Sequence, residues 1–382
     1  MKDFDFKLPT RLIFGAGKVD ALASLPLPGR CAMIVITGGK SMRANGYLER
    51  VERNLRQNGC RTVVFDKVLP NPIRAHVMEG AALAVREGCD FIVGLGGGSS
   101  IDSAKAIAIM AVNPGDYWDY VSGGTGGGEP FVRDPLPVVA IPTTAGTGTE
   151  ADPWTVITHE ERNEKIGFGN DKTFPAISIV DPELMLTVPP RLTAFQGFDA
   201  LFHAMEGAMA NIATPLSDSF AYRSIELIAG NLAAAVKCGS DLEARGAVAA
   251  ASTLAGLVEA TSCCISQHSL AHAIGALHPN IPHGAALTAI SLEYFRHFED
   301  KCPDVYRRIA RALGSATVPE GLEELQRACG ADRIALSEYG VTCEEIPAIV
   351  DNAFATMGGL FLLDPVKLER EEAVGILRRS WR

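Results

Sequence analysis

The first half of the chain alternates short apolar runs with longer segments of helical period. Buried strands are predicted where β-branched residues concentrate, at Cys31–Thr37, Arg61–Asp66, Asp90–Leu95, Pro137–Ile141 and Ala176–Val180. Between them, apolar residues recur at helical spacing and predict helices at Tyr47–Asn58, Ile73–Glu87 and Ile101–Ala111. Strands that alternate with helices are typical of a parallel sheet covered by helices on both faces.

The pattern changes at Pro189-Pro190. Beyond these prolines the β-branched runs stop, and Ala-rich segments of helical period continue to the end of the chain. Thr193 is a candidate N-cap there, with Gln196 three residues later in the capping-box position. A chain of 382 residues usually forms more than one domain. We therefore predict an α/β domain over residues 1–185 and an all-helical domain over residues 186–382.

Composition and charge narrow the class of protein. The chain is 47% hydrophobic and 21% charged, as in globular proteins, and its net charge is −10. That acidic surplus argues against binding to nucleic acid or to an anionic membrane surface. The start of the chain has no signal-peptide pattern, and the Ala-rich stretch Gly246–Val258 is shorter than the roughly 20 residues of a membrane span. Nine cysteines without a CxxC pair suit a reducing compartment, so we expect a cytoplasmic protein.

A glycine-rich turn follows the predicted strand that ends at Leu95. The stretch from Phe91 to Asp102 reads FIVGLGGGSSID, and its glycines allow the backbone to approach an anion closely. The N–H groups at the start of the next helix can then hold a phosphate. The spacing is not the common dinucleotide fingerprint, and a tight turn without any ligand is the alternative reading.

Two more turns of this kind follow other strands. Gly38, Gly39, Lys40 and Ser41 come after Cys31–Thr37 and offer a cation and a hydroxyl, where many dinucleotide sites place a carboxylate. This favours a 2′-phosphate and hence NADP(H), although a glycine turn with a solvated lysine explains the stretch equally well. The stretch PTTAGTGT, residues 142–149, interleaves threonine hydroxyls with glycines. Ligands of open α/β sheets bind where such strand ends meet, so the first domain is predicted to bind a dinucleotide.

Histidines gather in the second half of the chain. Asp199 and His203 are four residues apart, as are His268 and His272, and this spacing places each pair on one face of a helix. His283 follows Pro282 at a predicted turn. A lone histidine in an Ala-rich helix is usually structural, but five of the eight histidines fall between residues 203 and 283. Carboxylate and imidazole donors suit Fe(II), Zn(II), Co(II) or Mn(II), so a metal site is predicted in this domain.

Taken together, these stretches resemble the iron-containing (group III) alcohol dehydrogenase family along nearly the whole chain. The matching motifs are FGAGKVDAL, GGGSSIDSAKA, IPTTAGTGTE, KIGF, VDPELMLTVPPRLTAFQGFDALFHAMEG and HSLAHAIGALHPNIPHG. The resemblance implies an α/β dinucleotide-binding domain with a parallel sheet, followed by an all-helical metal-binding domain. It also implies that the metal ligands are Asp199, His203, His268 and His283.

The resemblance assigns further roles in the same way. Gly97, Gly98 and Ser99 match the family's pyrophosphate turn, and Asp102 matches a residue near the nicotinamide. His272 matches a histidine beside the metal that is a candidate for proton relay. Lys165 matches a lysine near the nicotinamide ribose, and the hydroxyl-rich cofactor loop is matched by Thr143, Thr144 and Thr147.

Two positions depart from the family's usual pattern, and one histidine could compete with His272. NAD-preferring members usually carry an aspartate where this chain has Gly38, and GGKSMRANG looks like the NADP-preferring, butanol-dehydrogenase-like branch. Thr149 replaces a more usual serine. His278, between the last two implied ligands, could compete as a cleft histidine.

The predicted activity is reversible hydride transfer between NAD(P)(H), with NADP(H) favoured over NAD(H), and a small primary alcohol, diol or aldehyde. Iron is favoured over zinc only by resemblance, and a homo-oligomer, by default a dimer, follows from what is common in the family. One alternative is a zinc- and NAD-dependent polyol or glycerol-phosphate dehydrogenase. A lyase of the dehydroquinate-synthase type is a second, but the helical half shows no basic cluster beside the ligand segments, and its phosphorylated substrate would need one.

Overall fold

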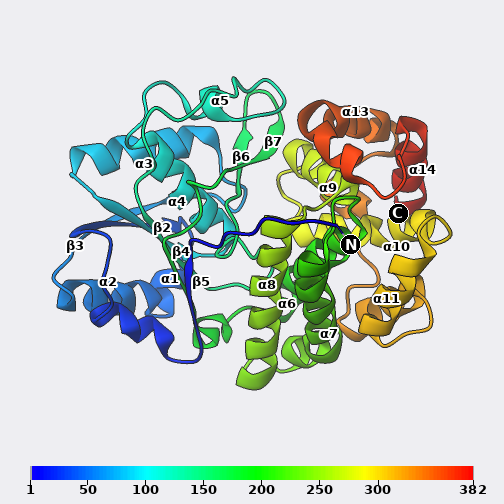
Figure 1. Ribbon diagram of the computed structural model, residues 1–382, viewed down its shortest axis with the longest axis horizontal. Coiled ribbons are helices and arrows are strands. Elements are labelled where there is room, and N and C mark those ends of the chain that lie inside the picture. The colour runs from blue at the N-terminus through cyan, green and yellow to red at the C-terminus, as the bar shows by residue number, and fades with distance from the viewer. Residues whose placement is uncertain (1, 382) are drawn as a thin grey trace.

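The computed structural model describes residues 2–381, which form two lobes placed side by side (Figure 1). All strands lie before residue 181, and from Pro190 onward the elements are helical. The predicted fold class, a parallel α/β domain followed by an all-helical one, is confirmed.

The first lobe is built on a six-stranded sheet in which every neighbouring pair is parallel. Its strands, in spatial order, are β1 (Arg11–Phe14), β8 (Ile177–Val180), β5 (Val138–Pro142), β4 (Phe91–Gly96), β2 (Cys31–Thr37) and β3 (Arg61–Val68). The buried β-branched runs form the inner strands because a sheet that is covered on both faces has no polar side to present to water.

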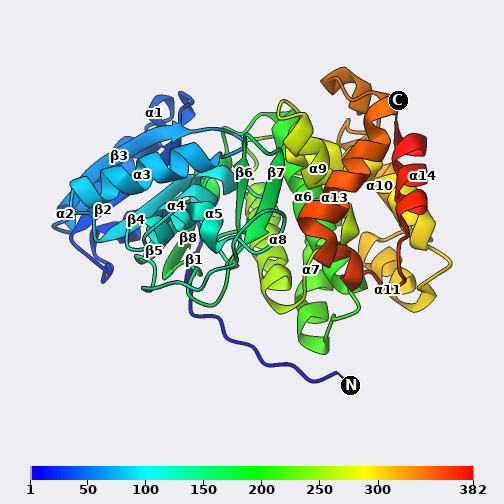
Figure 2. The same ribbon diagram turned by 90° about the horizontal axis from the view of Figure 1, so that it is seen from above.

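Helices cover both faces of this sheet. Helices α3 (Arg74–Arg86) and α4 (Gly98–Met110) pack on one face, and α2 (Tyr47–Gln57) packs on the other (Figures 1 and 2). Successive residues of β2 point to opposite faces: Met33 belongs to the α3–α4 core, and Ile34 belongs to the α2 core.

The order of the strands creates a crevice at one edge of the sheet. From β2 the chain passes to β3 on one side, and it then returns to form β4 on the other side of β2. This reversal is the topological switch point, where the loops after β2 and β4 diverge and leave room for a ligand.

The five predicted strands are confirmed, and β2 has the predicted bounds. Three short strands escaped prediction: β1 and the antiparallel hairpin of β6 (Thr155–His159) and β7 (Glu164–Phe168). Strand β1 has four residues, of which Arg11 and Phe14 are exposed, so it lacks the apolar run that marks a buried strand.

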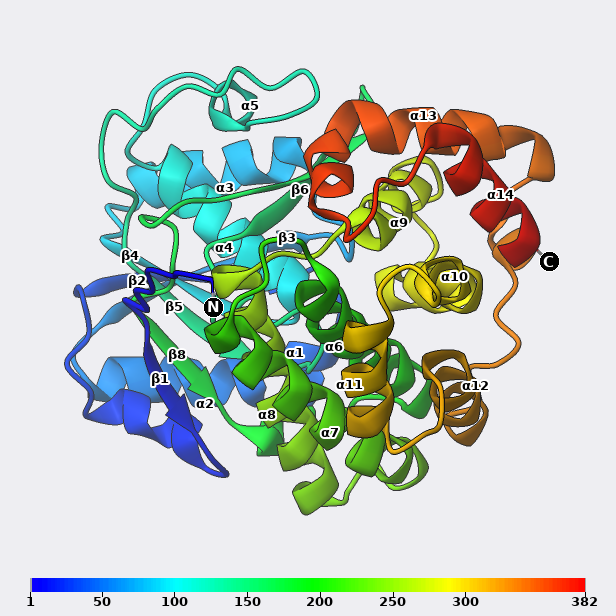
Figure 3. The ribbon, with the colours of Figure 1, turned by 45° about the vertical axis from the view of Figure 1, so that its right-hand side comes forward.

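The second lobe consists of packed helices (Figure 3). They are α6 (Pro190–Met209), α7 (Pro215–Lys237), α8 (Leu242–Thr261), α9 (Ser266–Leu277), α10 (His283–Phe298), α11 (Pro303–Leu313), α12 (Val318–Ala328), α13 (Ile346–Met357) and α14 (Arg370–Ser380). Helices α6 and α9 are buried along nearly their whole length and lie at the centre of the lobe.

The predicted N-cap at Thr193 is wrong. Helix α6 begins three residues earlier, at Pro190, with Pro189 as its N-cap. Proline suits the first helical position because its fixed φ matches the helix and its missing N–H would have no partner there. The Thr193 hydroxyl instead accepts a 2.7 Å hydrogen bond from Arg245 and ties α6 to α8.

The two lobes are held together at their margins. The N-terminal segment leaves the sheet and runs along the helical lobe (Figure 2), where the Phe6 and Phe220 rings lie 6.2 Å apart. In addition, the Lys2 ammonium donates to the Asn211 carbonyl oxygen. The N-terminal segment therefore connects the α/β lobe to the helical lobe.

Within residues 2–381, the stretch Ile346–Leu363 is long and apolar enough to cross a membrane by length and composition alone. It comprises α13 and a 3-10 segment, η5 (Gly358–Leu363), and 39% of it is buried. Helices α8 and α9 pass the same test only together, across a bend of 106°.

Candidate active site

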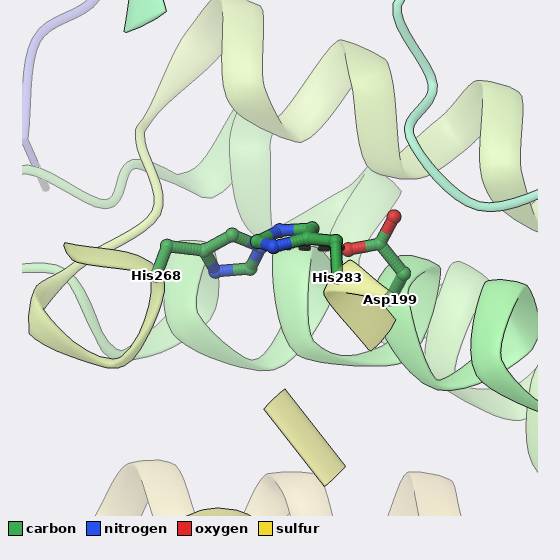
Figure 4. Close-up of side chains that lie close together, drawn as sticks. All are labelled: Asp199, His268 and His283. Carbon is green, nitrogen blue, oxygen red and sulfur yellow. Dashed lines mark ion pairs between the residues drawn. The ribbon is translucent and has the colours of Figure 1, made fainter. Parts of the chain in front are cut away.

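Three helices bring a carboxylate and three imidazoles together in the second lobe. Asp199 and His203 stand one turn apart on α6, His268 lies on the first turn of α9, and His283 is the first residue of α10. All three imidazoles approach Asp199 Oδ1. His268 Nε2 and His283 Nε2 each lie 3.6 Å from this oxygen, and His203 Nδ1 lies 3.9 Å from it. Figure 4 shows the His268 and His283 rings extending toward the Asp199 carboxylate above α6.

These side chains fit a divalent metal ion. Donor atoms bound at about 2.1 Å around a tetrahedral ion are roughly 3.4 Å apart. Ligand atoms of Asp199, His268 and His283 all lie within 4.8 Å of one another, and His203 Nδ1 lies 3.9 Å from Asp199 Oδ1. Buried polar atoms are normally hydrogen-bonded, and each of these four residues leaves one without a partner. Those atoms are Asp199 Oδ1, His203 Nδ1 and His268 Nε2, which face one another, and His283 Nδ1, the ring nitrogen opposite the Nε2 that approaches Asp199.

A second carboxylate, Glu206, orients His268 from behind. Glu206 is fully buried on α6, and its Oε1 lies 2.5 Å from His268 Nδ1. Its Oε2 accepts hydrogen bonds from the backbone N–H groups of Ile265, at 2.8 Å, and of His268, at 3.3 Å. The contact places a proton on Nδ1 and leaves Nε2 facing Asp199, the arrangement common to histidine ligands of metals.

Glu206 was not among the residues predicted from sequence. It lies three residues after His203, so Asp199, His203 and Glu206 form a D-x3-H-x2-E pattern on one helix. That spacing places Glu206 near the ligand face, but it does not show that the carboxylate meets a histidine of another helix.

The electrostatics of the cluster favour a cation. Burial by itself lowers the pKa of His268, but the charges of Glu206 and Asp199 outweigh burial and raise this pKa to about 10. Burial, and then the charge on His268, lowers the pKa of His203 to about 4. The negative charge around His268 is therefore large enough to hold a proton on a buried imidazole, and a metal ion would satisfy the same field.

His272 lies beside this cluster without joining it. Its ring centre is 5.0 Å from that of His283, and its Nδ1 is 2.9 Å from the Met357 sulfur. Burial, followed by the positive charge of Lys165, lowers the pKa of His272 well below its usual value, so the ring stays neutral. The possible competitor His278 does not line the cavity, and its Nε2 lies 3.6 Å from Glu345 on a different surface.

A cavity of about 190 Å³ joins the histidine cluster to the α/β lobe. It brings together predicted residues from both halves of the chain. Those that line it are Gly98, Ser99, Asp102, Thr147, Lys165, Asp199, His203, His268, His272 and His283.

The glycine turn and the threonine loop form one wall of this cavity. Helix α4 begins at Gly98, directly after β4, with Gly97 as its N-cap. A Cβ atom on Gly98 would lie 2.6 Å from the Thr147 methyl, and one on Gly97 would lie 3.0 Å from the Thr144 hydroxyl. Thr143 donates its backbone N–H to Gly96 at 2.8 Å. Glycine is therefore required here because the loop lies directly on the turn.

Asp102 lines the cavity, and hydrogen bonds fix both of its carboxylate oxygens. One of its oxygens accepts from the Thr149 hydroxyl at 2.7 Å, and the other accepts from the Val156 N–H at 3.0 Å. Beneath it, the fully buried Lys105 ammonium donates to Thr149 and lies 3.2 Å from an Asp152 oxygen. The Thr149 hydroxyl thus connects Asp102 to a buried cation.

Lys165 reaches the cavity from β7. Its ammonium donates to the Asn71 side chain at 3.0 Å, and Asn71 in turn donates to the Pro279 carbonyl at 2.7 Å. A Cβ atom on Gly275 would lie 3.5 Å from the Lys165 ammonium, so α9 passes close by. Burial lowers the pKa of Lys165 to about 8.

The stretch Gly38–Ser41 does not line the cavity. It follows β2 at the switch point, where Gly38 donates its N–H to the Val68 carbonyl at 2.9 Å and Lys40 is exposed. Nearby, Arg43 and Asp66 form an ion pair at 2.9 Å. This stretch and the glycine turn thus follow the two neighbouring strands β2 and β4.

Part of the cavity wall was not foreseen from sequence. Trp154, Glu259, Cys263 and Met357 line it. All nine cysteines, which lie within residues 2–381, are free in the structure.

Comparison with known proteins covers both lobes. Residues 9–182 match the family model "Iron-containing alcohol dehydrogenase", and residues 193–381 match "Fe-containing alcohol dehydrogenase family, C-terminal". An NAD-dependent methanol dehydrogenase of Bacillus methanolicus is 35% identical over 92% of this chain and 93% of its own length. An NADPH-dependent butanol dehydrogenase of Clostridium saccharobutylicum is 35% identical over 81% of this chain and 78% of its own. The structure of an archaeal alcohol dehydrogenase from a Red Sea brine pool superposes with a TM-score of 0.94, at 36% identity and full coverage of both chains.

Proposed function

Because the chain belongs to the iron-containing alcohol dehydrogenase family and is an NAD(P)-dependent alcohol oxidoreductase, we propose that it reduces short aldehydes with NADPH. The observation that carries the proposal is the shared cavity, in which the histidine cluster of the helical lobe faces the glycine turn and Lys165 of the α/β lobe. One cavity can thus hold the reacting carbon next to a nicotinamide.

We propose Asp199, His203, His268 and His283 as the ligands of Fe(II). Family membership supports iron, and the N/O donor set also suits Zn(II), which usually binds such ligands more tightly. Bound there, the ion would supply Lewis acidity at the substrate oxygen. Glu206 would hold the His268 ring in the orientation that binding requires.

The remaining residues would bind the cofactor and transfer the proton. Gly97, Gly98 and Ser99 would meet the pyrophosphate at the start of α4. Asp102 and Lys165 would lie toward the nicotinamide, since both line the cavity beside that turn. His272, neutral and next to the metal ligands, would pass a proton between the substrate oxygen and water.

The preference for NADP(H) rests on the stretch Gly38–Ser41 at the switch point. Lys40 supplies a cation and Ser41 a hydroxyl after β2, and Gly38 stands where a ribose-binding carboxylate would exclude a 2′-phosphate. An NADP preference favours aldehyde reduction as the physiological direction.

Replacing Gly38 with aspartate is expected to lower the NADPH/NADH ratio of kcat/KM by at least about tenfold. The new carboxylate would accept hydrogen bonds from the adenosine ribose and repel a 2′-phosphate. Gly38 lacks the left-handed φ that would require glycine, and its Cβ would lie 3.2 Å from the Asp66 carbonyl oxygen. Steady-state kinetics with both cofactors measure the ratio, and an unchanged ratio would contradict the assignment.

The activity itself is tested by loading the purified protein with Fe(II) or Zn(II) and comparing NADPH and NADH across short aldehydes. We expect metal-dependent oxidation of NADPH. Full turnover by protein freed of metal with a chelator would overturn the proposal. A polyol panel in the same assay separates the alternative polyol dehydrogenase.

We further propose a cytoplasmic homo-oligomer that acts on small molecules alone. The net charge of −10 supports a protein without a nucleic-acid partner. Light scattering of the purified protein measures the oligomeric state.

A further inference from the structure

The wall of the cavity contributed by α8 carries a carboxyl group that the chemistry above does not use. Glu259 stands in the last turn of α8, and its side chain lines the cavity that contains the histidine cluster. The residue is only 6% exposed, and its Oε1 is buried without a hydrogen-bond partner. Burying a carboxyl group without a hydrogen-bond partner costs free energy, so a bound ligand is the natural source of that partner.

No cation within residues 2–381 is paired with Glu259. The Lys105 ammonium is occupied by Asp152 and by carbonyl oxygens, and the Lys165 ammonium donates to Asn71. Glu259 takes part in no ion pair among these residues, whereas Asp102 and Asp152 in the same wall both have hydrogen-bond partners. The unused carboxyl group therefore faces the space that a substrate would enter.

Two neighbouring features add to the attraction for a positive charge. The C-terminal end of the 20-residue helix α8 carries the negative end of its dipole, which stabilises cations near the last turn. The Trp154 indole N–H donates to the Glu259 carbonyl oxygen at 3.3 Å, so the ring lies beside the same turn and lines the cavity. Carboxylate and indole together are typical groups for binding an ammonium ion.

The surrounding groups disfavour the charged form of Glu259 when the cavity is empty. Burial, and then the neighbouring Cys263, raises the pKa of its carboxyl group well above the usual value. A cation beside the carboxylate would counteract both effects. The walls formed by Met357 and Leu360 would contact the carbon chain of such a ligand.

We propose that Glu259 is a specificity-determining residue that binds a protonated amino group on the substrate. The preferred substrates are then short amino alcohols or aminoaldehydes, whose oxygen lies at the histidine cluster and whose ammonium group meets Glu259. This substrate class rests on the proposed alcohol–aldehyde activity.

The test compares 3-amino-1-propanol with 1-butanol, its neutral analogue of similar size, and with 1,3-propanediol. In the metal-loaded wild-type enzyme we expect kcat/KM for the amino alcohol to exceed that for butanol. In Glu259→Gln this ratio falls at least about tenfold, as for loss of a charge-assisted hydrogen bond, while the propanediol/butanol ratio changes less. An unchanged amino alcohol/butanol ratio, or a larger loss for the diol, overturns the proposal.

A binding measurement separates this inference from the activity on which it rests. Calorimetric titration of the metal-loaded protein with 3-amino-1-propanol, without nicotinamide cofactor, should show at least about tenfold weaker binding in Glu259→Gln. Equal binding by both proteins overturns the assignment, whether or not any alcohol is turned over. Absence of turnover with all three alcohols would instead count against the proposed function.

Glu150→Gln is the matched control. Glu150 is also buried and contacts α8 through a 2.7 Å hydrogen bond from Thr253, but it does not line the cavity. The same chemical change there should leave the substrate ratio and the binding of 3-amino-1-propanol as in wild type. Glu259→Gln leaves no protein group without a partner, since none is paired with Oε1.

Discussion

Replacing His268 with alanine is expected to remove the bound divalent ion and to lower kcat/KM by roughly a thousandfold or more, because Lewis-acid stabilisation of several kcal/mol is lost. His268 lies at the centre of the cluster, with its Nε2 3.6 Å from Asp199 and its ring 4.2 Å from that of His203. Truncation also leaves the buried Glu206 carboxylate without its imidazole partner. Metal content by elemental analysis and steady-state kinetics measure the two losses.

His278→Ala is the control for this variant. His278 lies ten residues away in sequence and pairs with Glu345 at 3.6 Å, outside the cavity. We expect it to keep its metal and its turnover. NADPH binding, followed by fluorescence, should persist in His268→Ala because the glycine turn belongs to the other lobe. Retention of metal and full activity in His268→Ala would refute the proposed ligand set.

Glu206→Gln is expected to weaken metal affinity by about 10- to 100-fold without removing a ligand. The amide can still reach His268 Nδ1, but it carries no charge to stabilise the imidazole in the tautomer that presents Nε2 to the metal. It can also offer its NH2 group where the backbone N–H groups of Ile265 and His268 need an acceptor. Competition with a chelator of known affinity measures the change.

The matched control for the Glu206 variant is Glu345→Gln, which alters a carboxylate beside an imidazole that does not line the cavity. Its metal affinity should equal that of wild type. If Glu206→Gln also binds metal like wild type, Glu206 does not position His268. A loss of activity that excess metal restores would support positioning, because a group needed for the reaction itself would not be replaced in this way.

The inner strands of the α/β lobe could be predicted because a strand that is buried on both faces is a continuous apolar run in the sequence. The apolar run Cys31–Thr37 matches β2 residue for residue. Strand β1 has no such continuous apolar run, because it lies at the sheet edge next to β8 and is partly exposed. The start of α6 was misplaced because Thr193 and Gln196 fit a capping box locally, whereas consecutive prolines begin the helix earlier.

The candidate site, too, could be predicted only in part from the sequence. Helical spacing alone placed Asp199 with His203 and His268 with His272, because residues four apart share a helix face. Spacing could not separate the functions of His268 and His272. Contacts of the His268 ring with Glu206 and Asp199 on α6 turn it toward the cluster, whereas His272 lies beside Met357.

The sequence by itself therefore determined the order of the elements, the two-part architecture and the residue types that can hold a metal ion and a phosphate. These properties are encoded locally, in periodicity and in the spacing of polar residues. Only the tertiary structure decided that the histidine cluster and the glycine turn share one cavity, that Glu206 contacts His268, and that Glu259 faces the cavity without a partner. Each depends on the packing of elements far apart in the chain, and no local pattern specifies it.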